Sequence, residues 1–551
     1  MMLPASESLT VEFKSDRTQL SDRELAQAVV CLANTDGGTI YLGVEDDGRV
    51  TGLNSSRNFT EVGLAAQLNN HLAAPLVLTV SFLDVAEHRV VAIRVPKAAT
   101  VVATTNGIYT HRRLKPDGTP ECASMTAAQI TSRLANLRII DPSAQPVASA
   151  TLADLDPAER ERLREMATRA GGDRSLADLD DEQLDGALSL TVVREGVRVP
   201  TLTGLLMVGR EDAIRRLIPS HEIAFQVLDG EEVRTNEFRR FPLLRAFEWI
   251  ETIFTPLNPE REFQFGLFRV GVPLVDRRSF REAFANAVTH RDYARLGAVH
   301  VKLEREALVI TNPGGFVDGV TIDNLLTTPP TPRNPTLADA LKRVGLVERT
   351  GRGVDLIYRG LLRFGRPLPD YSASSATSVQ LRLPCMAPDP RFLELVVEEE
   401  ERSLRPLPVE SLIALSMLRE QRRVTRAQVA IAIQSNETRA GSTLEHLVER
   451  GLVEAHGRAR GRTYTLASKV YAALGDQIAY TRQVGLDGPR NEELVCKHVA
   501  EFGAIKRAHV MELCRLDENQ ATRLLARLVE GGRLTPTGEK RGRVYGPGPK
   551  P

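Results

Sequence analysis

A polar face on one predicted helix is the first place in this sequence where chemistry could occur. Glu282, Asn286 and His290 lie four residues apart, so their side chains project from the same face of a helix. Alanines at 283, 285 and 287 stand between them, and such small side chains let a ligand or another segment approach closely. The spacing predicts a helix over residues 281–293, in which His290 caps or packs rather than catalyses.

Strands and glycine-rich turns follow this helix. Residues 299–303 alternate apolar and polar side chains, and residues 307–311 form a short apolar run, which predicts two strands. The second strand ends in Asn312-Pro-Gly-Gly-Phe316, and the runs Arg333-Asn-Pro335 and Gly351-Arg-Gly353 come later. The sequence contains no GxxxxGK[ST] run, which excludes a P-loop helicase or motor.

This order of elements, over residues 266–385, resembles the GHKL ATPase fold of gyrase, histidine kinases and MutL. The resemblance implies an α/β sandwich that binds ATP and Mg²⁺. It implies that Glu282 polarises the attacking water and that the amide oxygen of Asn286 binds Mg²⁺, a cation that prefers oxygen ligands.

The resemblance also assigns roles to the turns. Asn312 stands where the family has an aspartate that hydrogen-bonds the adenine amino group; an amide oxygen accepts the same bond without a charge. Gly314 and Gly315 would let the backbone approach the nucleotide. Gly351 and Gly353 would hold phosphate on backbone N–H groups at the start of a helix.

The C-terminal quarter is basic and repeats itself. From Arg405 onward there are 24 Lys or Arg against 16 Asp or Glu, a net charge of +8 on a chain whose total is zero. Residues 426–429, 444–451 and 461–464 match residues 507–510, 525–532 and 542–545 at a constant offset of 81. Each copy predicts three helices followed by a basic hairpin, and the charge favours a polyanionic partner.

This pattern resembles a tandem pair of winged helix-turn-helix domains, which implies duplex DNA as the partner. In such domains the third helix enters the major groove and the hairpin, or wing, contacts phosphate. The alternative is that these domains serve in docking or dimerisation. The resemblance assigns DNA contacts to the third helices at Asn436, Thr438, Arg439, Asn519, Gln520, Thr522 and Arg523, and to the wings at Arg458, Arg460, Arg462, Lys540, Arg541 and Arg543.

The N-terminal segment predicts a helix between strands. Ser21 and Glu24 form a capping box, and helical spacing of apolar residues continues to Ala33 before Gly37-Gly38. Residues 40–44 alternate as a strand, and residues 107–112 predict an edge strand with a basic end. The runs from Glu7 to Lys14, from Ala33 to Gly38 and from Gly43 to Gly48 together resemble an AlbA-2 or Schlafen-type domain over residues 1–140.

In animal Schlafens a related domain cleaves RNA with three carboxylates, so the resemblance implies a second candidate site. Glu7, Glu12 and Asp46 or Asp47 could hold a divalent metal that positions water, with Lys14 beside them. Glu7 and Glu12 would point to opposite faces of one continuous strand, so a shared metal needs a bend between them. The alternative is a solvated strand edge beside a glycine turn.

Composition limits the remaining classes. The chain has 551 residues, 42% of them hydrophobic and 26% charged, as in ordinary multidomain globular proteins. The five cysteines show no CxxC spacing, so neither a disulfide framework nor a zinc site is expected. The polar N-terminus is not that of a signal peptide, and no apolar run is long enough for a membrane helix. We therefore expect a cytoplasmic bacterial protein with no membrane contact.

The predicted fold class is a multidomain α+β protein. It has a Schlafen/AlbA-2-like domain at 1–140, a linker at 141–157, an α/β connecting segment at 158–265, the GHKL-like domain at 266–385, a linker at 384–408, and winged helices at 405–475 and 486–548. Residues 202–209 predict a helix-to-strand junction. Whether the chain forms a homo-oligomer stays open.

Three functions fit these features. The first is an ATP-binding, DNA-binding transcriptional regulator whose nucleotide state tunes DNA binding. The second is a Schlafen-like, metal-dependent nuclease gated by ATP, as in defence against phage. The third is a scaffold in which a degenerate nucleotide site holds the fold together.

Overall fold

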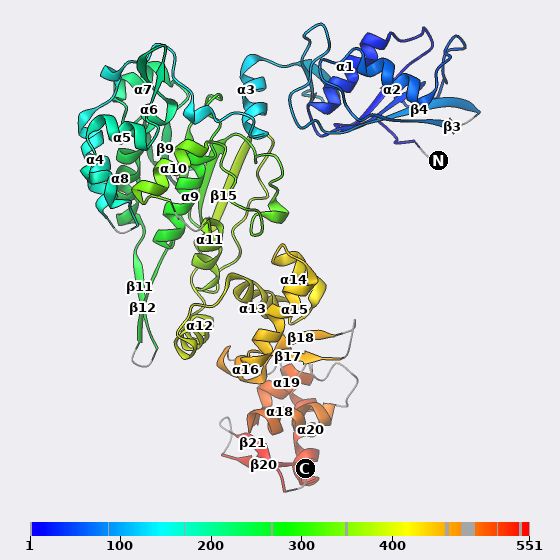
Figure 1. Ribbon diagram of the computed structural model, residues 1–551. Coiled ribbons are helices and arrows are strands. Elements are labelled where there is room, and N and C mark those ends of the chain that lie inside the picture. Colours follow the sequence, from blue (N-terminus) through cyan, green and yellow to red (C-terminus); the bar gives the residue numbers. More distant parts are fainter. Residues whose placement is uncertain are drawn as a thin grey trace. The chain divides into compact units, whose positions relative to one another are not determined.

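The computed structural model describes residues 3–85, 87–169, 171–265, 268–347, 351–457, 462–474, 491–514, 516–538 and 543–549 (Figure 1). The chain divides into two compact units. One unit comprises residues 1–145 with 292–296 and 333–336, and the other comprises the remaining residues. Within the described residues, no helix is both long and apolar enough to cross a membrane.

The N-terminal unit is built on a four-stranded sheet in the order β1-β2-β4-β3, in which only β1 and β2 run parallel. The helix α1 begins at the predicted capping box of Ser21 and Glu24, and its apolar face packs on the sheet with Leu25, Val29 and Ile40 fully buried. The elements of this unit are β1 (Val11–Lys14), α1 (Asp22–Ala33), β2 (Gly38–Leu42), α2 (Glu61–Asn69), β3 (Thr79–Val85), β4 (His88–Val95), β5 (Thr110–Leu114), β6 (Pro120–Ser124), α3 (Ala127–Asn136) and the 3-10 turn η1 (Pro142–Ala144).

A disulfide corrects the expectation drawn from cysteine spacing. Cys31 of α1 is bonded to Cys122 of β6, 91 residues later in the chain, with a Cα–Cα distance of 5.8 Å. The pairing depends on the tertiary placement of β6 beside α1, which spacing along the sequence does not reveal.

The central part of the second unit contains a five-stranded sheet in the order β10-β9-β13-β14-β15. The strand β13 pairs in parallel with β9, with Val299 opposite Ile223, and the other pairs are antiparallel. Because β9 and β10 precede residue 265, the sheet crosses the domain boundary expected between 265 and 266. The helix α9 packs against β13, β14 and α11, and its Phe284 meets Phe247 of α8 at 4.8 Å between ring centroids.

The elements of this central part begin with η2 (Leu152–Asp154), α4 (Pro157–Thr168), η3 (Arg174–Asp178), α5 (Asp181–Ala187), β7 (Thr191–Arg194), β8 (Val197–Pro200), α6 (Leu202–Val208), α7 (Glu211–Leu217), β9 (Ile223–Asp229), β10 (Glu232–Arg239), α8 (Leu243–Phe254) and η4 (Thr255–Leu257). They continue with β11 (Glu260–Phe265), β12 (Phe268–Pro273), α9 (Arg277–Thr289), β13 (Val299–Leu303), β14 (Ala307–Pro313), η5 (Ile322–Asn324), α10 (Pro335–Val344), α11 (Gly353–Leu362), β15 (Ser378–Pro384) and α12 (Pro390–Ser403).

Three segments differ from the sequence expectations. Residues 202–209, expected as a helix-to-strand junction, form the helix α6, and Gly209 makes only an isolated bridge with Leu155. The expected linker at 141–157 contains η1 and η2 with buried Ser143 and Leu155. The expected linker at 384–408 contains α12, because Phe392 and Val396 share a buried face that the acidic run at 398–401 concealed.

The C-terminal part confirms the internal repeat element by element. Two helix–hairpin units, each of three helices and a three-stranded sheet, contain matching elements; α15 and α20 begin 81 residues apart, at Glu437 and Glu518. The first unit contains α13 (Val409–Gln421), β16 (Arg423–Thr425), α14 (Arg426–Ala432), α15 (Glu437–Glu449), β17 (Val453–His456), β18 (Thr463–Leu466) and the additional α16 (Ser468–Leu474). The second contains α18 (Asn491–Phe502), β19 (Ile505–Lys506), α19 (Arg507–Cys514), α20 (Glu518–Glu530), β20 (Leu534–Thr537) and β21 (Val544–Pro547).

Candidate nucleotide site and nucleic-acid interface

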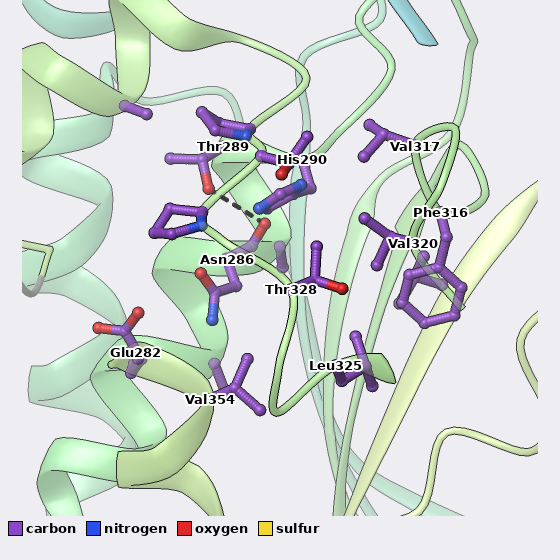
Figure 2. A pocket seen from close by; sticks show the side chains of 18 of the residues that line it. Glu282, Asn286, Thr289, His290, Phe316, Val317, Val320, Leu325, Thr328 and Val354 are labelled. Atoms are coloured by element: carbon purple, nitrogen blue, oxygen red, sulfur yellow. Dashed lines mark hydrogen bonds between the residues drawn. The ribbon is translucent and has the colours of Figure 1, made fainter. Parts of the chain in front are cut away.

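A cavity of about 300 Å³ opens between α9, the end of β14 and the start of α11. Glu282, Asn286 and His290 of the predicted polar face line it (Figure 2). Asn312 near the end of β14 and Gly315 after this strand line it as well. Gly351 and Gly353 line it from the other side, and Gly314 does not. Of the seven residues assigned to the nucleotide site from sequence, the structure therefore brings six to one cavity.

The helix α9 forms because its polar residues cap it and its small residues allow close packing. Asp276 caps the start by accepting from the N–H of Ser279 at 2.9 Å, and His290 ends the helix as its C-cap. Glu282 is only 5% exposed, so its carboxylate is held inside the protein at the cavity wall.

Glu282 lies directly against Gly353, the first residue of α11. A Cβ on Gly353 would overlap the Glu282 carboxylate, and the Cγ of Glu282 would be 3.0 Å from it. A negative charge is favourable at a helix start, where backbone N–H groups are unpaired and the helix dipole is positive. The sequence interpretation assigned Gly353 to phosphate binding. In the structure, the absence of a side chain at Gly353 makes room for the carboxylate of Glu282.

The turn after β14 is held by backbone contacts. Asn312 is buried, and its amide Nδ2 donates to the carbonyl of Pro313 at 3.3 Å. Gly314 has φ +95°, a left-handed conformation that favours glycine. A Cβ on Gly315 would lie 2.7 Å from the carbonyl oxygen of Ser375, so this glycine admits a neighbouring loop as well as bordering the cavity.

Two cations of the cavity were missed by the sequence interpretation. Lys342 comes from the last turn of α10 and Arg352 precedes α11, and both line the cavity. Burial and the nearby Glu410 raise the pKa of Asp355, a third charged group in the wall. Helical spacing on α10 could have pointed to Lys342, but no motif singles out these residues.

The cavity has the volume of a small ligand pocket and polar side chains in its wall. Its volume lies at the small end of the range for ligand pockets, about 300–1,000 Å³. Among the described residues, no group of three metal-ligating side chains comes together. Mg²⁺ is commonly held by one or two protein oxygens together with water and substrate phosphates, so one amide and one carboxylate suit it.

The predicted DNA-contacting residues of the third helices are all exposed on α15 and α20. Several are already engaged: Asn436 caps α15 by accepting from the N–H of Arg439 at 2.9 Å, and Gln520 completes the capping box of α20 with Asp517. The guanidinium of Arg439 pairs with Glu410 at 2.7 Å. Thr438, Asn519, Thr522 and Arg523 complete the exposed set.

The hairpins carry the other predicted contacts. Arg462 pairs with Glu445 at 3.0 Å and lies over the ring of Tyr464, so it contributes to the packing of its own unit. Arg543 is exposed directly before β21. Arg458, Arg460, Lys540 and Arg541 lie outside the described residues.

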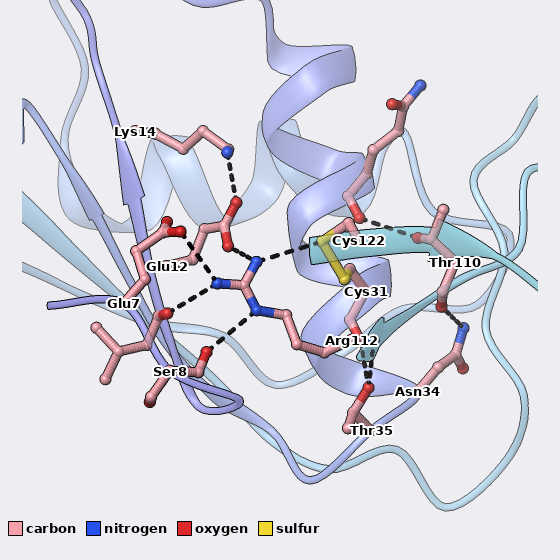
Figure 3. Close-up of a disulfide and its surroundings, with 12 residues drawn as sticks. Glu7, Ser8, Glu12, Lys14, Cys31, Asn34, Thr35, Thr110, Arg112 and Cys122 are labelled. Carbon is pink, nitrogen blue, oxygen red and sulfur yellow. Dashed lines mark hydrogen bonds and ion pairs between the residues drawn. A yellow bond between two sulfur atoms is a disulfide. The ribbon is translucent and has the colours of Figure 1, made fainter. Parts of the chain in front are cut away.

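The N-terminal carboxylates converge on an arginine (Figure 3). Arg112 of β5 is 4% exposed; its Nη2 lies 3.5 Å from Glu7, and its Nη1 forms an ion pair with Glu12. Burial lowers the pKa of Arg112. Lys14 pairs with Glu12 as well, whereas Asp47 pairs with Arg49 at 2.7 Å. Glu7 and Glu12 thus share a guanidinium, and Asp47 has its own cation on the turn that also carries Asp46.

Four family models match successive parts of the chain. The model described as "Schlafen, AlbA_2" matches residues 7–117, and a domain of unknown function matches 134–224. The model described as "Putative ATP-dependent DNA helicase recG C-terminal" matches 297–383. The model described as "DNA glycosylase AlkZ-like" matches 398–548. The Schlafen/AlbA-2 resemblance is therefore confirmed, and the cavity includes residues of an ATPase-like domain.

The match to the ATPase-like model begins after α9. The placement of Glu282 and Asn286 in the candidate site therefore depends on the cavity geometry alone. No curated protein matches the chain. The crystal structure of the DIP2311 protein from Corynebacterium diphtheriae is similar at 22% identity and a TM-score of 0.50, covering 98% of this chain and 95% of that one. At this identity the likeness concerns the fold.

These comparisons define a class of protein. The chain combines a Schlafen/AlbA_2 domain, an ATPase-like domain and a DNA-related C-terminal region. The ATPase-like domain and the C-terminal region match families described as nucleotide- or DNA-related. The N-terminal domain matches the Schlafen family model.

Proposed function

We propose that the chain is a transcriptional regulator that binds duplex DNA, binds ATP with Mg²⁺, and changes its DNA binding with its nucleotide state. The observation that carries this proposal is the cavity, which Glu282 and Asn286 of α9 and Asn312 of β14 line together with two cations, Lys342 and Arg352. Polar groups that converge in a concave site, with cations among them, suit a phosphorylated ligand.

Each group has a role in this proposal. Lys342 and Arg352 neutralise phosphate, and the amide oxygen of Asn286 supplies a ligand to Mg²⁺. Bound Mg²⁺ would neutralise phosphate charge. The carboxylate of Glu282 orients water where hydrolysis takes place. Asn312 presents its amide oxygen to the adenine amino group, because its nitrogen is already used by the Pro313 carbonyl.

The helix–hairpin units supply the DNA-binding part of the proposal. Their order of three helices and a three-stranded sheet supports the winged helix-turn-helix assignment, with α15 and α20 as the third helices. The net charge of +8 from residue 405 onward and the AlkZ-like match both support a nucleic-acid partner.

The nuclease alternative has weaker support. It rests on the Schlafen/AlbA_2 match, whereas Glu7 and Glu12 are engaged by Arg112. A buried guanidinium already neutralises these carboxylates, so a divalent cation would have to displace it. We therefore assign Glu7 and Glu12 a structural role, and rank metal-dependent cleavage below regulation.

The proposal is tested by titrating the full chain with ATP and Mg²⁺ in a calorimeter. Saturable binding is expected; Asn286→Ala should weaken it by removing the metal ligand, and Asn70→Ala, an exposed asparagine of the N-terminal unit, should not. Glu282→Ala should retain binding and lose any hydrolysis. Absence of binding at millimolar ATP would contradict the proposal.

A further inference from the structure

The turn between α14 and α15 is attached to a wall of the nucleotide cavity. The side chain of Gln434 donates from Nε2 to the carbonyl of Ile322 at 2.8 Å. Its Oε1 accepts from the backbone N–H of Leu326 at 2.7 Å. One glutamine of the first helix–hairpin unit therefore bonds both ends of residues 322–326, which we name the hinge segment.

Part of the hinge segment and the nearby Thr328 also line the cavity. Leu325, Leu326 and Thr328 line it, and Leu325 faces it together with Val354 of α11 in Figure 2. Leu326 and Val354 pack at the same time against the apolar core of the first helix–hairpin unit. The same side chains thus border the nucleotide cavity and support the unit proposed to bind DNA.

Helix α11 makes a second connection between the two sites. Tyr358 is buried in the core of the first helix–hairpin unit; burial raises its pKa, and the nearby side chain of Gln434 lowers it. One turn earlier, Asp355 lies in the cavity wall. Burial raises the pKa of Asp355, and the nearby carboxylate of Glu410 raises it further. Glu410 is the residue that pairs with Arg439 of α15.

This arrangement engages residues at the end of α15 that would meet DNA. In helix-turn-helix proteins, the N-terminal residues of the recognition helix contact the bases. Gln434 lies two residues before the N-cap Asn436, and Arg439 lies in the first turn of the helix. Asn436 and Thr438 stay exposed, but Arg439 is paired with Glu410, so a contact from Arg439 to DNA must break this ion pair.

We propose that nucleotide in the cavity holds the hinge segment against Gln434 and so keeps the first helix–hairpin unit off DNA. This inference rests on the proposed function and gives its regulation a direction. The docked hinge segment supplies Leu325 and Leu326 to the cavity wall, so a nucleotide binds best when the turn is docked. DNA binds best when the turn is released, and the two ligands therefore oppose each other reciprocally.

The test measures DNA affinity of the full chain by fluorescence anisotropy on a labelled duplex of mixed sequence. Measurements are made with and without a saturating, non-hydrolysable ATP analogue and Mg²⁺. We expect the analogue to weaken DNA binding by about fivefold or more, the low end of known coupling between sites. Weak binding should persist through α20, whose Asn519 and Arg523 remain exposed.

Variants of Gln434 locate the coupling. Gln434→Gly removes both hydrogen bonds and suits the left-handed backbone, φ +54°, so the unit should stay folded. In this variant DNA affinity should be as high as, or higher than, that of the parent, and the analogue should no longer lower it. Gln434→Glu keeps the acceptor for Leu326 and loses the donor to Ile322, so it should show an intermediate response.

The control is Gln421→Ala, an exposed glutamine at the end of α13, which should respond like the parent. The inference is overturned if the analogue binds but leaves DNA affinity unchanged or raises it, or if Gln434→Gly responds like the parent. Failure to bind the analogue at all in calorimetry would overturn the proposed function, and this inference with it.

Discussion

Replacing Gly353 by alanine tests the contact at the centre of the cavity. The new Cβ would overlap the carboxylate of Glu282, and even the Cγ of Glu282 would be 3.0 Å away. The end of this side chain must move, although Glu282 is only 5% exposed. Overpacking of this kind costs about 1–3 kcal/mol, so Gly353→Ala should lower the free energy of unfolding by that amount.

The matched control is Gly186→Ala, since this helical glycine has no atom within 4 Å of a built Cβ. Alanine there should be neutral or slightly stabilising because its helix propensity is higher. A double-mutant cycle isolates the contact: in a Glu282→Ala background, Gly353→Ala should cost less than about 0.5 kcal/mol, as expected when the colliding side chain is gone.

The assay is urea unfolding followed by tryptophan fluorescence. Trp249 is the only tryptophan of the chain and lies on α8, which packs against α9, so its emission reports this domain. If Gly353→Ala unfolds at the same urea concentration as Gly186→Ala, or costs as much without Glu282 as with it, the contact between Glu282 and α11 is refuted.

Three further predictions concern other parts of the chain. Arg112→Met should destabilise the N-terminal unit by about 3–5 kcal/mol in thermal unfolding, because Glu7 and Glu12 lose their buried partner; equal stability would contradict this. Burial lowers the pKa of His221 to about 4 from an ordinary 6.5. Between pH 4 and pH 6.5 the unfolded state therefore binds more protons than the folded state. Stability should therefore fall by at most about 3 kcal/mol as pH drops from 6.5 to 4, and His221→Gln should show a smaller fall in unfolding scans across this range. Charge reversal of Arg523 and Arg543 should weaken duplex binding by the full chain for all sequences and flatten its salt dependence, whereas reversal of the exposed Arg49 should not.

Local signals in the sequence predicted the local structure well. The capping box of Ser21 and Glu24 starts α1, and the spacing of Glu282 and Asn286 predicted a helix that the structure contains as α9. The repeat was predictable because both copies keep the same apolar spacing and a cap-forming residue before the third helix, and α15 and α20 begin 81 residues apart. Such features depend on neighbours within one or two turns.

Tertiary partners were not predictable in the same way. Arg112 is about a hundred residues from Glu7 and Glu12 along the chain, and Cys122 is 91 residues from Cys31. Lys342 and Gln434 acquire their places through packing of whole helices, which no motif records. The helix α12 was missed for another reason, since an acidic run masked its apolar face.

Hydrogen exchange of the full chain, with and without saturating ATP and Mg²⁺, tests most directly whether this cavity is the regulatory nucleotide site. Exchange reports local opening along the backbone, so it places the ligand without a substitution. We predict slower exchange with nucleotide at the start of α11, in residues 322–328 and in the turn before α15. Saturating nucleotide that leaves all three segments unchanged, or protects only other parts of the chain, would contradict the account.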